Sequence, residues 1–321
     1  MKRFPLWITL LPLVAGLGVY GFYWDRERDA FETRLETLFG EGRAPVGGFP
    51  YRLEAEVAAP RIRHSGDYVF EASAARAVVN RQPWRTELSF IRSLKPRLQW
   101  RVPALGDIRF DIASASAQTS LRLDGERIVR LSSVDEAAEV RLPFVRMPAQ
   151  AASFEWHFRE TPAAPDPASR APTFPEQAQL VLAAEGLRFG QGDPLSLAAQ
   201  IGITSTAPVW DLASWRRGGT VELRRLTLAD KTGEVMALTA TGSASLTDPL
   251  RIAGTVETVC PESVQALFAG RPMPAREYRA RRPVTFSFGG PADDLRLLLP
   301  AEGAPRRPVR EQEPPCPMFW G

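Results

Sequence analysis

The sequence predicts a mainly β protein with large curved antiparallel sheets in two related halves, a few short helices and one N-terminal transmembrane helix. Three observations lead to this fold class. The 321-residue chain starts with one long apolar run, most of the remainder alternates apolar and polar residues, and a proline-rich segment divides the alternating part. Alternation with a period of two is typical of half-buried strands, and short runs separated by Gly and Asp turns favour antiparallel hairpins.

The apolar run covers residues 4–24, which begin with Phe4 and end with Trp24, and it follows the positive charges of Lys2 and Arg3. As a helix it would cover about 30 Å, the thickness of the hydrocarbon layer of a bilayer. Its far end is rich in bulky aromatic residues, which favour a retained membrane helix, whereas signal peptidase prefers small residues. We therefore predict a membrane anchor at residues 1–24, with residues 15–18 as a weaker alternative site of cleavage. Because positive charge precedes the helix, we expect a single-pass inner-membrane protein with a cytoplasmic N-terminus and a periplasmic bulk.

Residues 25–40 are predicted to form a stalk helix that packs on the following domain. Phe31, Leu35 and Leu38 recur at helical spacing among charged residues, and Gly40 is placed to end the helix.

The first β half is predicted at residues 41–160. A Gly-Gly-Phe-Pro turn at residues 47–50 precedes an alternating strand at residues 51–57. The alternation returns in segments that place Trp84, Thr86, Leu88 and Phe90, then Leu121 and Leu123, then Phe154, Trp156 and Phe158, on the apolar side. An Asp-Gly turn at residues 124–125 predicts a hairpin that continues to Leu131.

Residues 161–176 contain five prolines, which cannot lie within a strand ladder, and are predicted to be a linker or loop. The second β half is predicted at residues 177–300, with strands around residues 180–182, 195–203, 221–223, 284–288 and 295–299. Short helices are expected at residues 209–217 and 261–269, the second with Pro261 at its start and Gly270 at its end. Residues 301–321 are rich in Pro, Arg and Glu and are predicted to be a disordered tail.

Composition places the chain among ordinary globular proteins, with 44% hydrophobic and 24% charged residues and a net charge of +3. The arginines are scattered among acidic residues, so we expect no nucleic-acid partner. The only cysteines are Cys260 and Cys316. In an oxidising compartment they could pair, and two free thiols are the alternative.

We predict no catalytic, cofactor-binding or metal site. The histidines, His64 and His157, are far apart within strand patterns and lack the spacing of metal ligands, and His157 is expected to face solvent. Four carboxylate pairs occur, and none is expected to be catalytic: Glu54/Glu56, Asp107/Asp111, Asp135/Glu136 and Asp293/Asp294. Glu54/Glu56 is interpreted as the solvated outer face of a strand, and Asp293/Asp294 as a turn. Glycines at 186, 190 and 192 are interpreted as hairpin turns. Paired arginines at 216–217, 224–225, 279–282 and 306–307 are interpreted as solvated strand edges, with contact to anionic head groups as the alternative.

The order of several motifs resembles a known bacterial family. The motifs are the apolar N-terminal run, the Gly-Gly-Phe-Pro turn that leads into the first strand, and Gln-Pro-Trp at residues 82–84. Together with the two β halves, they are similar to the uncharacterised family catalogued as domain of unknown function 2125, found in Gram-negative alphaproteobacteria. This resemblance implies no activity and no functional residues. Residues 237–256 are similar in style to AsmA-like envelope proteins, which also have one N-terminal span and a periplasmic β domain and are implicated in envelope lipid homeostasis.

Two classes of function follow from these expectations. The first is a non-enzymatic, membrane-anchored periplasmic protein that binds a phospholipid, an acyl chain or another hydrophobic ligand in envelope maintenance. The alternative is a periplasmic scaffold that binds an envelope protein partner through sheet edges or loops. The inner membrane, contacted through residues 4–24, is an expected partner in both cases.

Overall fold

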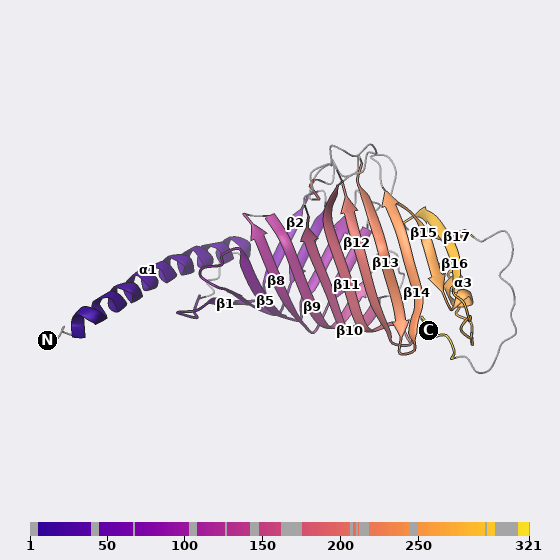
Figure 1. The fold of residues 1–321 in the computed structure, drawn as a ribbon, viewed down its shortest axis with the longest axis horizontal. Coiled ribbons are helices and arrows are strands. Elements are labelled where there is room, and N and C mark those ends of the chain that lie inside the picture. Colours follow the sequence, from indigo (N-terminus) through magenta and orange to yellow (C-terminus); the bar gives the residue numbers. More distant parts are fainter. Residues whose placement is uncertain are drawn as a thin grey trace, which may run out of the picture.

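The computed structural model describes residues 6–39, 45–66, 68–102, 108–125, 127–141, 148–161, 175–205, 208–209, 211, 218–243, 250–292, 294–298 and 314–320, with the side chains of residues 6–9 and 108 excepted. These residues form two helices, α1 (Leu6–Phe39) and α3 (Pro261–Ala269), and one antiparallel sheet of seventeen strands (Figure 1). The mainly β, antiparallel fold class is therefore confirmed.

The strands are β1 (Leu53–Ala58), β2 (Arg61–Ser65), β3 (Val69–Ser73), β4 (Arg76–Arg81), β5 (Leu88–Leu94), β6 (Arg97–Val102), β7 (Ile108–Ala113), β8 (Ser116–Asp124), β9 (Arg127–Arg141), β10 (Ala149–Glu160), β11 (Glu176–Phe189), β12 (Leu195–Thr204), β13 (Thr220–Asp230), β14 (Gly233–Ser243), β15 (Arg251–Thr258), β16 (Val284–Pro291) and β17 (Arg296–Leu298).

The sheet consists of one long series of paired strands and one branch. The series runs β1-β4-β5-β8-β9 and then continues in chain order from β10 to β17. The branch runs β2-β3-β6-β7 and joins the C-terminal end of β9, where residues 139–141 pair with β7. The proline-rich segment connects β10 to β11, and these two strands pair with each other, so one sheet includes residues on both sides of it.

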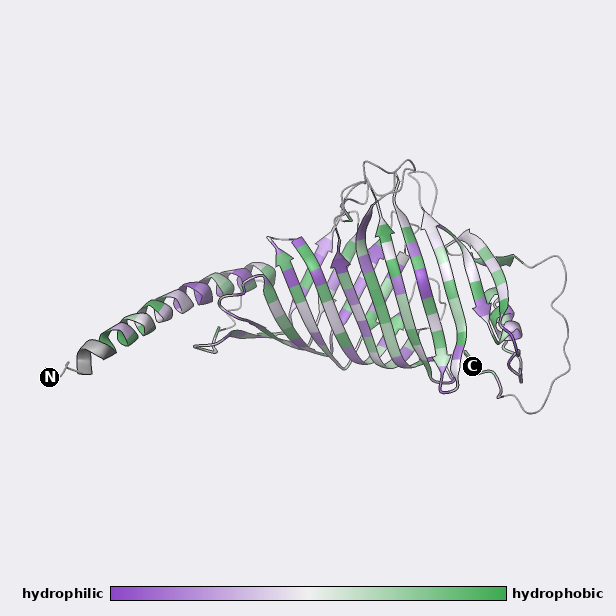
Figure 2. Cartoon of the chain, in the orientation of Figure 1, coloured by the Kyte–Doolittle hydropathy of each residue, from purple (hydrophilic) through white to green (hydrophobic). Residues whose placement is uncertain are grey.

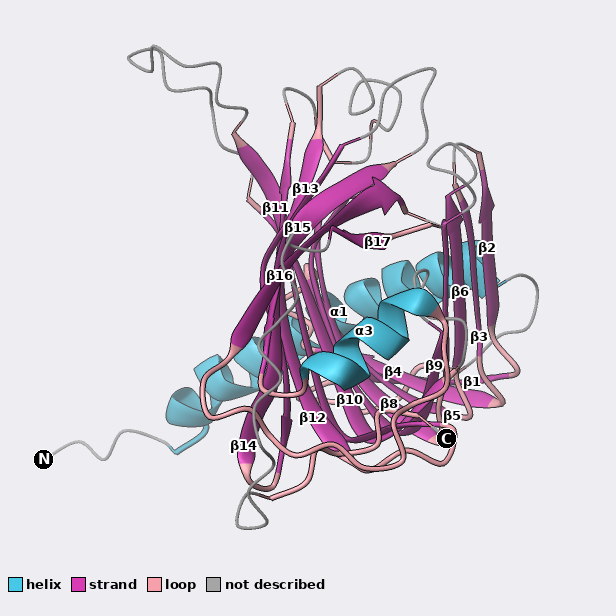
Figure 3. Ribbon diagram, turned by 90° about the vertical axis from the view of Figure 1, so that its right-hand side faces the viewer, coloured by secondary structure: helices cyan, strands magenta, loops and turns pink. Residues whose placement is uncertain are grey.

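The branch arises because extended segments bend sharply along one line of the sheet, which we call the crease. The crease crosses the chain at residues 59–60, 74–75, 95–96 and 114–115 and at Ala137. Backbone hydrogen bonds continue through it, from Lys95 N to Ala115 O at 2.8 Å and from Ala115 N to Glu136 O at 2.9 Å. Figure 3 shows the result, with the branch strands standing as a separate wall beside the strands of the main series.

Alternate strands at the crease carry a residue with positive φ, in the left-handed region that lies outside the extended conformation of a strand. Ala59, Lys95 and Ala137 have φ values of 47°, 50° and 49°. Gly186 has a φ of 64° inside β11, so this glycine is a bulge residue and not the hairpin turn that the sequence suggested. At each such position the left-handed backbone interrupts the extended conformation and bends the strand. The pairing register is the same on both sides of Ala59, Lys95 and Ala137, whereas it shifts by one residue beside Gly186.

Hydrophobic and hydrophilic residues alternate along most strands, so the sheet has two faces of different chemistry (Figure 2). We call the face that packs against α1 and α3 the inner face, and the opposite face the outer face. The larger apolar cluster lies on the inner face of strands β9 to β16 and includes Phe154, Val256 and Phe286. A smaller cluster joins α1 to β1 and β4.

Helix α1 is continuous from Leu6 to Phe39 and projects from one end of the sheet (Figure 1). The predicted stalk segment packs as expected through Phe31 and Leu35, which are buried against the strands together with Trp24. Leu38 is 53% exposed, contrary to its predicted place on the buried side. Residues 1–5 and Gly40 lie outside the described part of the chain. In that described part, no helix combines the length and apolarity that crossing a bilayer requires.

Helix α3 begins and ends where the sequence predicts. Pro261 occupies its first turn, and Gly270 ends it in the left-handed conformation with a φ of 60°. The other predicted short helix, at residues 209–217, lies largely outside the described residues.

The last described segment, residues 314–320, differs from the predicted disordered tail. Cys316 forms a disulfide with Cys260, which decides between the two alternatives for the cysteines. Phe319 is only 3% exposed and packs in the larger apolar cluster, and Met318 and Asp193 hydrogen-bond each other in both directions. The remainder of the predicted tail, residues 301–313, lies outside the description.

Two strand predictions in the first half are wrong in extent, and the second of them is also wrong in face. Tyr51 is 76% exposed in the turn before β1, and residues 84–87 form a turn before β5. Within β5, Ile91 faces the same side as the buried Val79, which puts Leu88 and Phe90 on the outer face. The predicted apolar side was therefore inverted, because pairing with β4 decides the face that each residue takes.

Candidate ligand-binding face

Residues that are directly opposite each other in neighbouring strands lie on the same face of a sheet. One such row begins at Ala55 and Val79 beneath α1 and ends at Val256 and Phe286 in the larger cluster. Its intervening members are Ile91, Thr119, Ser133, Trp156, Leu182, Ala199, Leu226 and Leu238. Helices α1 and α3 therefore pack on the same face of the sheet, at its two ends.

A second row on the inner face lies two residues further along each strand, or three along β13, where the register shifts by one residue. It is apolar and only half-buried. We call it the apolar row, and it consists of Leu121, Leu131, Phe158, Leu180, Ile201 and Leu223. Leu223 packs at the margin of the larger cluster, whereas Leu121, Leu131, Leu180 and Ile201 belong to neither of the two described clusters. Half-buried aliphatic side chains in one continuous line favour contact with another apolar molecule.

The inner face becomes polar toward α1. The row that contains Leu121 continues to Ser89 on β5 and then to Arg81 on β4. Further hydroxyl groups on this part of the inner face belong to Ser93, Thr119 and Ser133, of which Thr119 and Ser133 are 3.1 Å apart. The inner face thus has a polar end at β4, β5 and β8 and an apolar row that extends from β8 to β13.

Arg81 is the charged residue of this polar end, and it is 3% exposed. Its Nη2 donates to the backbone carbonyl of Glu27 at 3.3 Å and lies 3.6 Å from the Glu27 carboxylate. Its guanidinium lies 4.6 Å from the centre of the Phe31 ring, and Nε donates to no described acceptor. Burial lowers the pKa of Arg81, and the Glu27 carboxylate opposes this effect.

Asp135 is a second buried charge on the inner face, and unlike Arg81 it has several short hydrogen bonds. Its carboxylate accepts hydrogen bonds from Ser114 Oγ at 2.8 Å, Ser133 Oγ at 3.0 Å and Trp156 Nε1 at 3.1 Å. Burial raises its pKa, although these three donors act in the opposite direction. Because Ser114 lies at the crease, Asp135 connects β9, β10 and the bend between β7 and β8.

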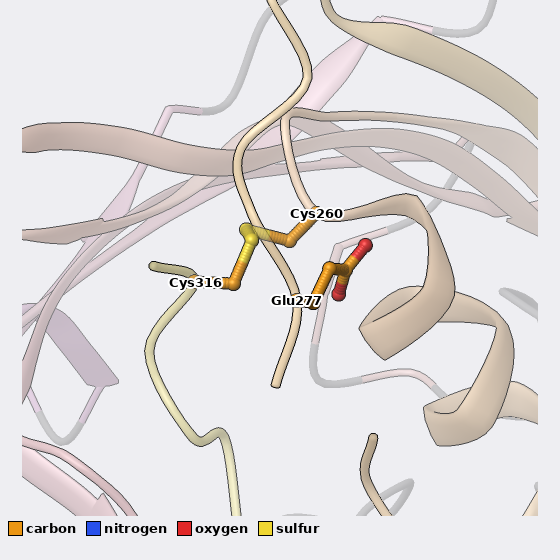
Figure 4. Close-up of side chains that lie close together, drawn as sticks. All are labelled: Cys260, Glu277 and Cys316. Carbon is orange, nitrogen blue, oxygen red and sulfur yellow. A yellow bond between two sulfur atoms is a disulfide. The ribbon is translucent and has the colours of Figure 1, made fainter. Parts of the chain in front are cut away.

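A cluster at α3 has the residue types of a metal site (Figure 4). Ligand atoms of Cys260, Glu277 and Cys316 lie within 4.8 Å of one another. The two sulfurs are joined in a disulfide, however, so neither offers the thiolate that a metal requires. The Glu277 carboxylate accepts from Glu262 N at 2.7 Å and from Ser263 N at 2.8 Å, and it thereby caps the helix. This cluster is structural in its oxidised form.

The other residues considered in the sequence lie apart from one another. His64 stacks on Tyr68 with ring centres 4.7 Å apart, and His157 faces outward beside Glu155. Glu54 and Glu56 share the outer face of β1, opposite the buried Leu53 and Ala55.

Of the carboxylate pairs, the structure describes Asp111 without Asp107 and Asp294 without Asp293. Arg224, Arg225 and Arg279 form ion pairs with Glu176, Glu234 and Asp230 respectively. Paired arginines at 216–217 and 306–307 are outside the described chain.

Sequence reasoning missed Arg81, and it considered Asp135 only as one member of a carboxylate pair without a catalytic role. The only available signal was their position in the strand alternation, because each lies two residues after a buried residue and therefore on the same face of its strand. Val79 and Ala77 precede Arg81 on its face, and Ser133 precedes Asp135.

Comparison with known proteins identifies a matching family. The model of a family described as "Uncharacterized protein conserved in bacteria (DUF2125)" matches residues 41–289, which confirms the resemblance drawn from the motif order. No curated protein and no solved structure matches the chain. The similarity to AsmA-like proteins finds no support in these comparisons.

Proposed function

The chain belongs to the DUF2125 family of uncharacterized bacterial proteins, and for this member we propose a non-enzymatic role at the bacterial inner membrane, in which the inner face of the sheet binds the apolar part of a lipid. The observation that carries this proposal is the apolar row. Its six side chains form one register line over β8, β9, β10, β11, β12 and β13. At roughly 4.8 Å between neighbouring strands, the row is roughly 24 Å long. A single acyl chain covers half of the hydrocarbon layer, or about 15 Å, and therefore fits along it.

We place the protein at the membrane through residues 4–24, from Phe4 to Trp24, with the N-terminus in the cytoplasm. In the described part of α1, large apolar side chains are exposed to solvent over nearly four turns: Leu10, Leu11, Leu13, Val14, Leu17, Val19 and Phe22. Apolar exposure on this scale is typical of surfaces that contact a membrane or a partner. Insertion of this segment would bury these side chains and hold the sheet close to the lipid.

The disulfide supports a periplasmic position for the sheet. Disulfides form and persist in oxidising compartments and are rare in the cytosol of mesophilic bacteria. The Cys260–Cys316 bond also secures Phe319 in the larger cluster, so its formation contributes to the folded state.

Photocrosslinking in native membranes tests this proposal. Adjacent residues of β11 give a matched pair of probe sites, because Leu180 is in the apolar row and Val181 is on the outer face. We expect a benzoylphenylalanine probe at position 180 to crosslink to phospholipid acyl chains, detected by mass spectrometry of the purified full chain. The same probe at position 181 should give several-fold less lipid adduct. Equal lipid labelling at both positions, or none at either, would contradict the proposal.

A scaffold function is the second candidate, and the free edge of β2 is the observation that favours it. β2 pairs with β3 on one side, and no described strand pairs with its other side. An edge strand of this kind can accept a strand from a partner protein. A probe at Arg63 that crosslinks one envelope protein, combined with no lipid adduct at position 180, would favour this second function.

A further inference from the structure

We infer that the inner face binds an amphiphile with an anionic head group, with the head at Arg81 and the neighbouring hydroxyls and the chain along the apolar row. This inference rests on the proposed function and adds the class and the orientation of the ligand. The geometric basis is that Arg81, Ser89, Leu121 and Leu131 follow each other in one register line. A molecule that lies along this line meets a cation first, then hydroxyl groups, and then aliphatic side chains.

Arg81 is incompletely paired for a buried cation. Removing a guanidinium from water is costly unless short hydrogen bonds and a counterion replace the lost hydration. The Glu27 carboxylate is 3.6 Å away, the one side-chain hydrogen bond to a described residue is 3.3 Å long, and Nε is without a described acceptor. Charge-assisted hydrogen bonds to a guanidinium are normally about 2.7–2.9 Å long. Arg81 therefore retains donor capacity that a carboxylate or phosphate could use.

The neighbouring polar groups suit a head group rather than a second acyl chain. Ser89 and Ser93 lie on the same face of β5, and Thr119 and Ser133 are opposite each other on β8 and β9. Hydroxyl groups can donate hydrogen bonds to the oxygens of a carboxylate or phosphate. The fork-shaped arrangement of Arg donors suits both of these anions, so the chemistry shared by fatty acids and phospholipids defines the ligand class.

Glu27 of α1 would compete with the head group for Arg81. It is the nearest described carboxylate to the guanidinium, and it comes from the helix that covers this end of the inner face. Binding of the anion would replace the Glu27 carboxylate as the counterion. Neutralising Glu27 should consequently strengthen binding of the anionic amphiphile, whereas loss of Arg81 should weaken it.

The test uses the full-length protein in a non-ionic detergent and measures the affinity of amphiphiles that share one alkyl chain. The head groups are carboxylate, phosphate, hydroxyl and trimethylammonium. We expect the two anions to bind at least tenfold more tightly than the alcohol, and the cation to bind most weakly. Arg81→Gln should abolish the preference, and Glu27→Gln should raise the affinity for both anions several-fold. Arg76→Gln is the matched control, because Arg76 lies on the outer face of the same strand and pairs with Glu56.

The possible outcomes separate this inference from the proposed function. Equal affinity for the alcohol and the anions would overturn the inference and leave acyl-chain binding intact. Inorganic phosphate that competes as well as the alkyl phosphate would also overturn it, because the chain would then be dispensable. Failure of every amphiphile to bind, with no lipid adduct at position 180, would overturn both. If Arg81→Gln fails to fold, the head-group series on the unmodified protein still tests whether anions are preferred over the alcohol. Ser89→Ala provides a milder variant, which is expected to reduce the preference for anions a few-fold.

Discussion

Arg81 and Asp135 are buried charges on one face of one sheet, and their neighbours give them different roles. Asp135 has three donors within 3.1 Å and braces the crease, so its environment is complete without a ligand. Arg81 has only long contacts to Glu27 and an Nε without a described acceptor. Burial disfavours the charge of both residues, but only Arg81 has unused capacity for an anion.

Asp135→Asn is predicted to remove a pH-dependent loss of stability. Because burial raises the folded pKa above the ordinary value of 3.8, the native protein binds the proton more tightly than the unfolded chain does. The free energy of unfolding should therefore fall as the pH rises from about 3.8 through the raised folded pKa. The asparagine variant should lack this contribution and be more stable at neutral pH, as measured by urea unfolding at a series of pH values.

The neighbouring residue provides the control for this prediction. Glu136 lies on the outer face and accepts a hydrogen bond from Ser116. Glu136→Gln should therefore leave the contribution of Asp135 to the pH dependence of unfolding unchanged. Asp135→Ala should destabilise the protein by about 1–3 kcal/mol, because Trp156 Nε1 would lose its acceptor. If the free energy of unfolding of Asp135→Asn depended on pH in the same way as that of the unmodified protein, Asp135 would not be the source of this dependence.

At the scale of elements, the crease determines the shape of the sheet. Without the crease, β1 and β2 would form one straight strand, and so would β5 and β6. The branch would then not form a second wall. Three positive-φ residues of the crease, Ala59, Lys95 and Ala137, are not glycines. For an L-residue, the left-handed conformation costs about 1–2 kcal/mol relative to the usual conformation. The sheet therefore contains local strain that its surrounding ladder hydrogen bonds maintain.

Ala137→Gly is predicted to stabilise the protein by up to about 1 kcal/mol. Glycine adopts a φ near 49° without a steric penalty, and this gain exceeds its greater loss of backbone entropy, which is about 0.5–1 kcal/mol. Ala138→Gly, at the adjacent buried position, should instead destabilise by about 1 kcal/mol. Thermal unfolding of the two variants measures the difference, and the same sign for both would refute the argument.

The C-terminal segment depends on the disulfide. Cys316 closes a loop with a sequence separation of 56 residues, for which loop entropy gives a stabilisation of about 4 kcal/mol. Cys316→Ser should therefore lower the free energy of unfolding by up to about that amount. Reductant should destabilise the unmodified protein and have no effect on the double variant Cys260→Ser/Cys316→Ser. Insensitivity of the unmodified protein to reductant would show that the bond does not contribute.

At the scale of the whole molecule, residues on both sides of the proline-rich segment share one sheet and one core. β10 and β11 pair directly, and the larger cluster includes Ile112 and Val140 from before the segment and Val256 and Phe286 from after it. The continuous sheet also supports the apolar row, which extends over strands from both sides.

A protein cut within residues 162–174 is consequently predicted to remain assembled. An inserted protease recognition sequence would allow cleavage after folding, and the two fragments should elute together from a sizing column and separate only in denaturant. A second insertion, in the turn at residues 231–232, should give the same result because β13 and β14 also pair directly. Separation of the first pair of fragments without denaturant would indicate two independent domains.

The amino-acid sequence alone was enough to predict features that depend on neighbouring residues along the chain. The period of two identified β1, β8, β10 and β12, and Pro261 with Gly270 fixed both ends of α3. The motif order was sufficient to identify the family. Such signals are readable because strand alternation and helix capping are local properties of the backbone.

The three-dimensional structure was needed to show which face of β5 is buried, where Arg81 and Asp135 lie, and that Cys260 and Cys316 are joined. It also showed that part of the predicted tail packs in the core, through Phe319, although residues 301–321 as a whole are rich in Pro, Arg and Glu. These features depend on strand register and on partners distant in sequence. A shift of one residue in register moves every side chain of a strand to the opposite face, and no local pattern specifies that choice.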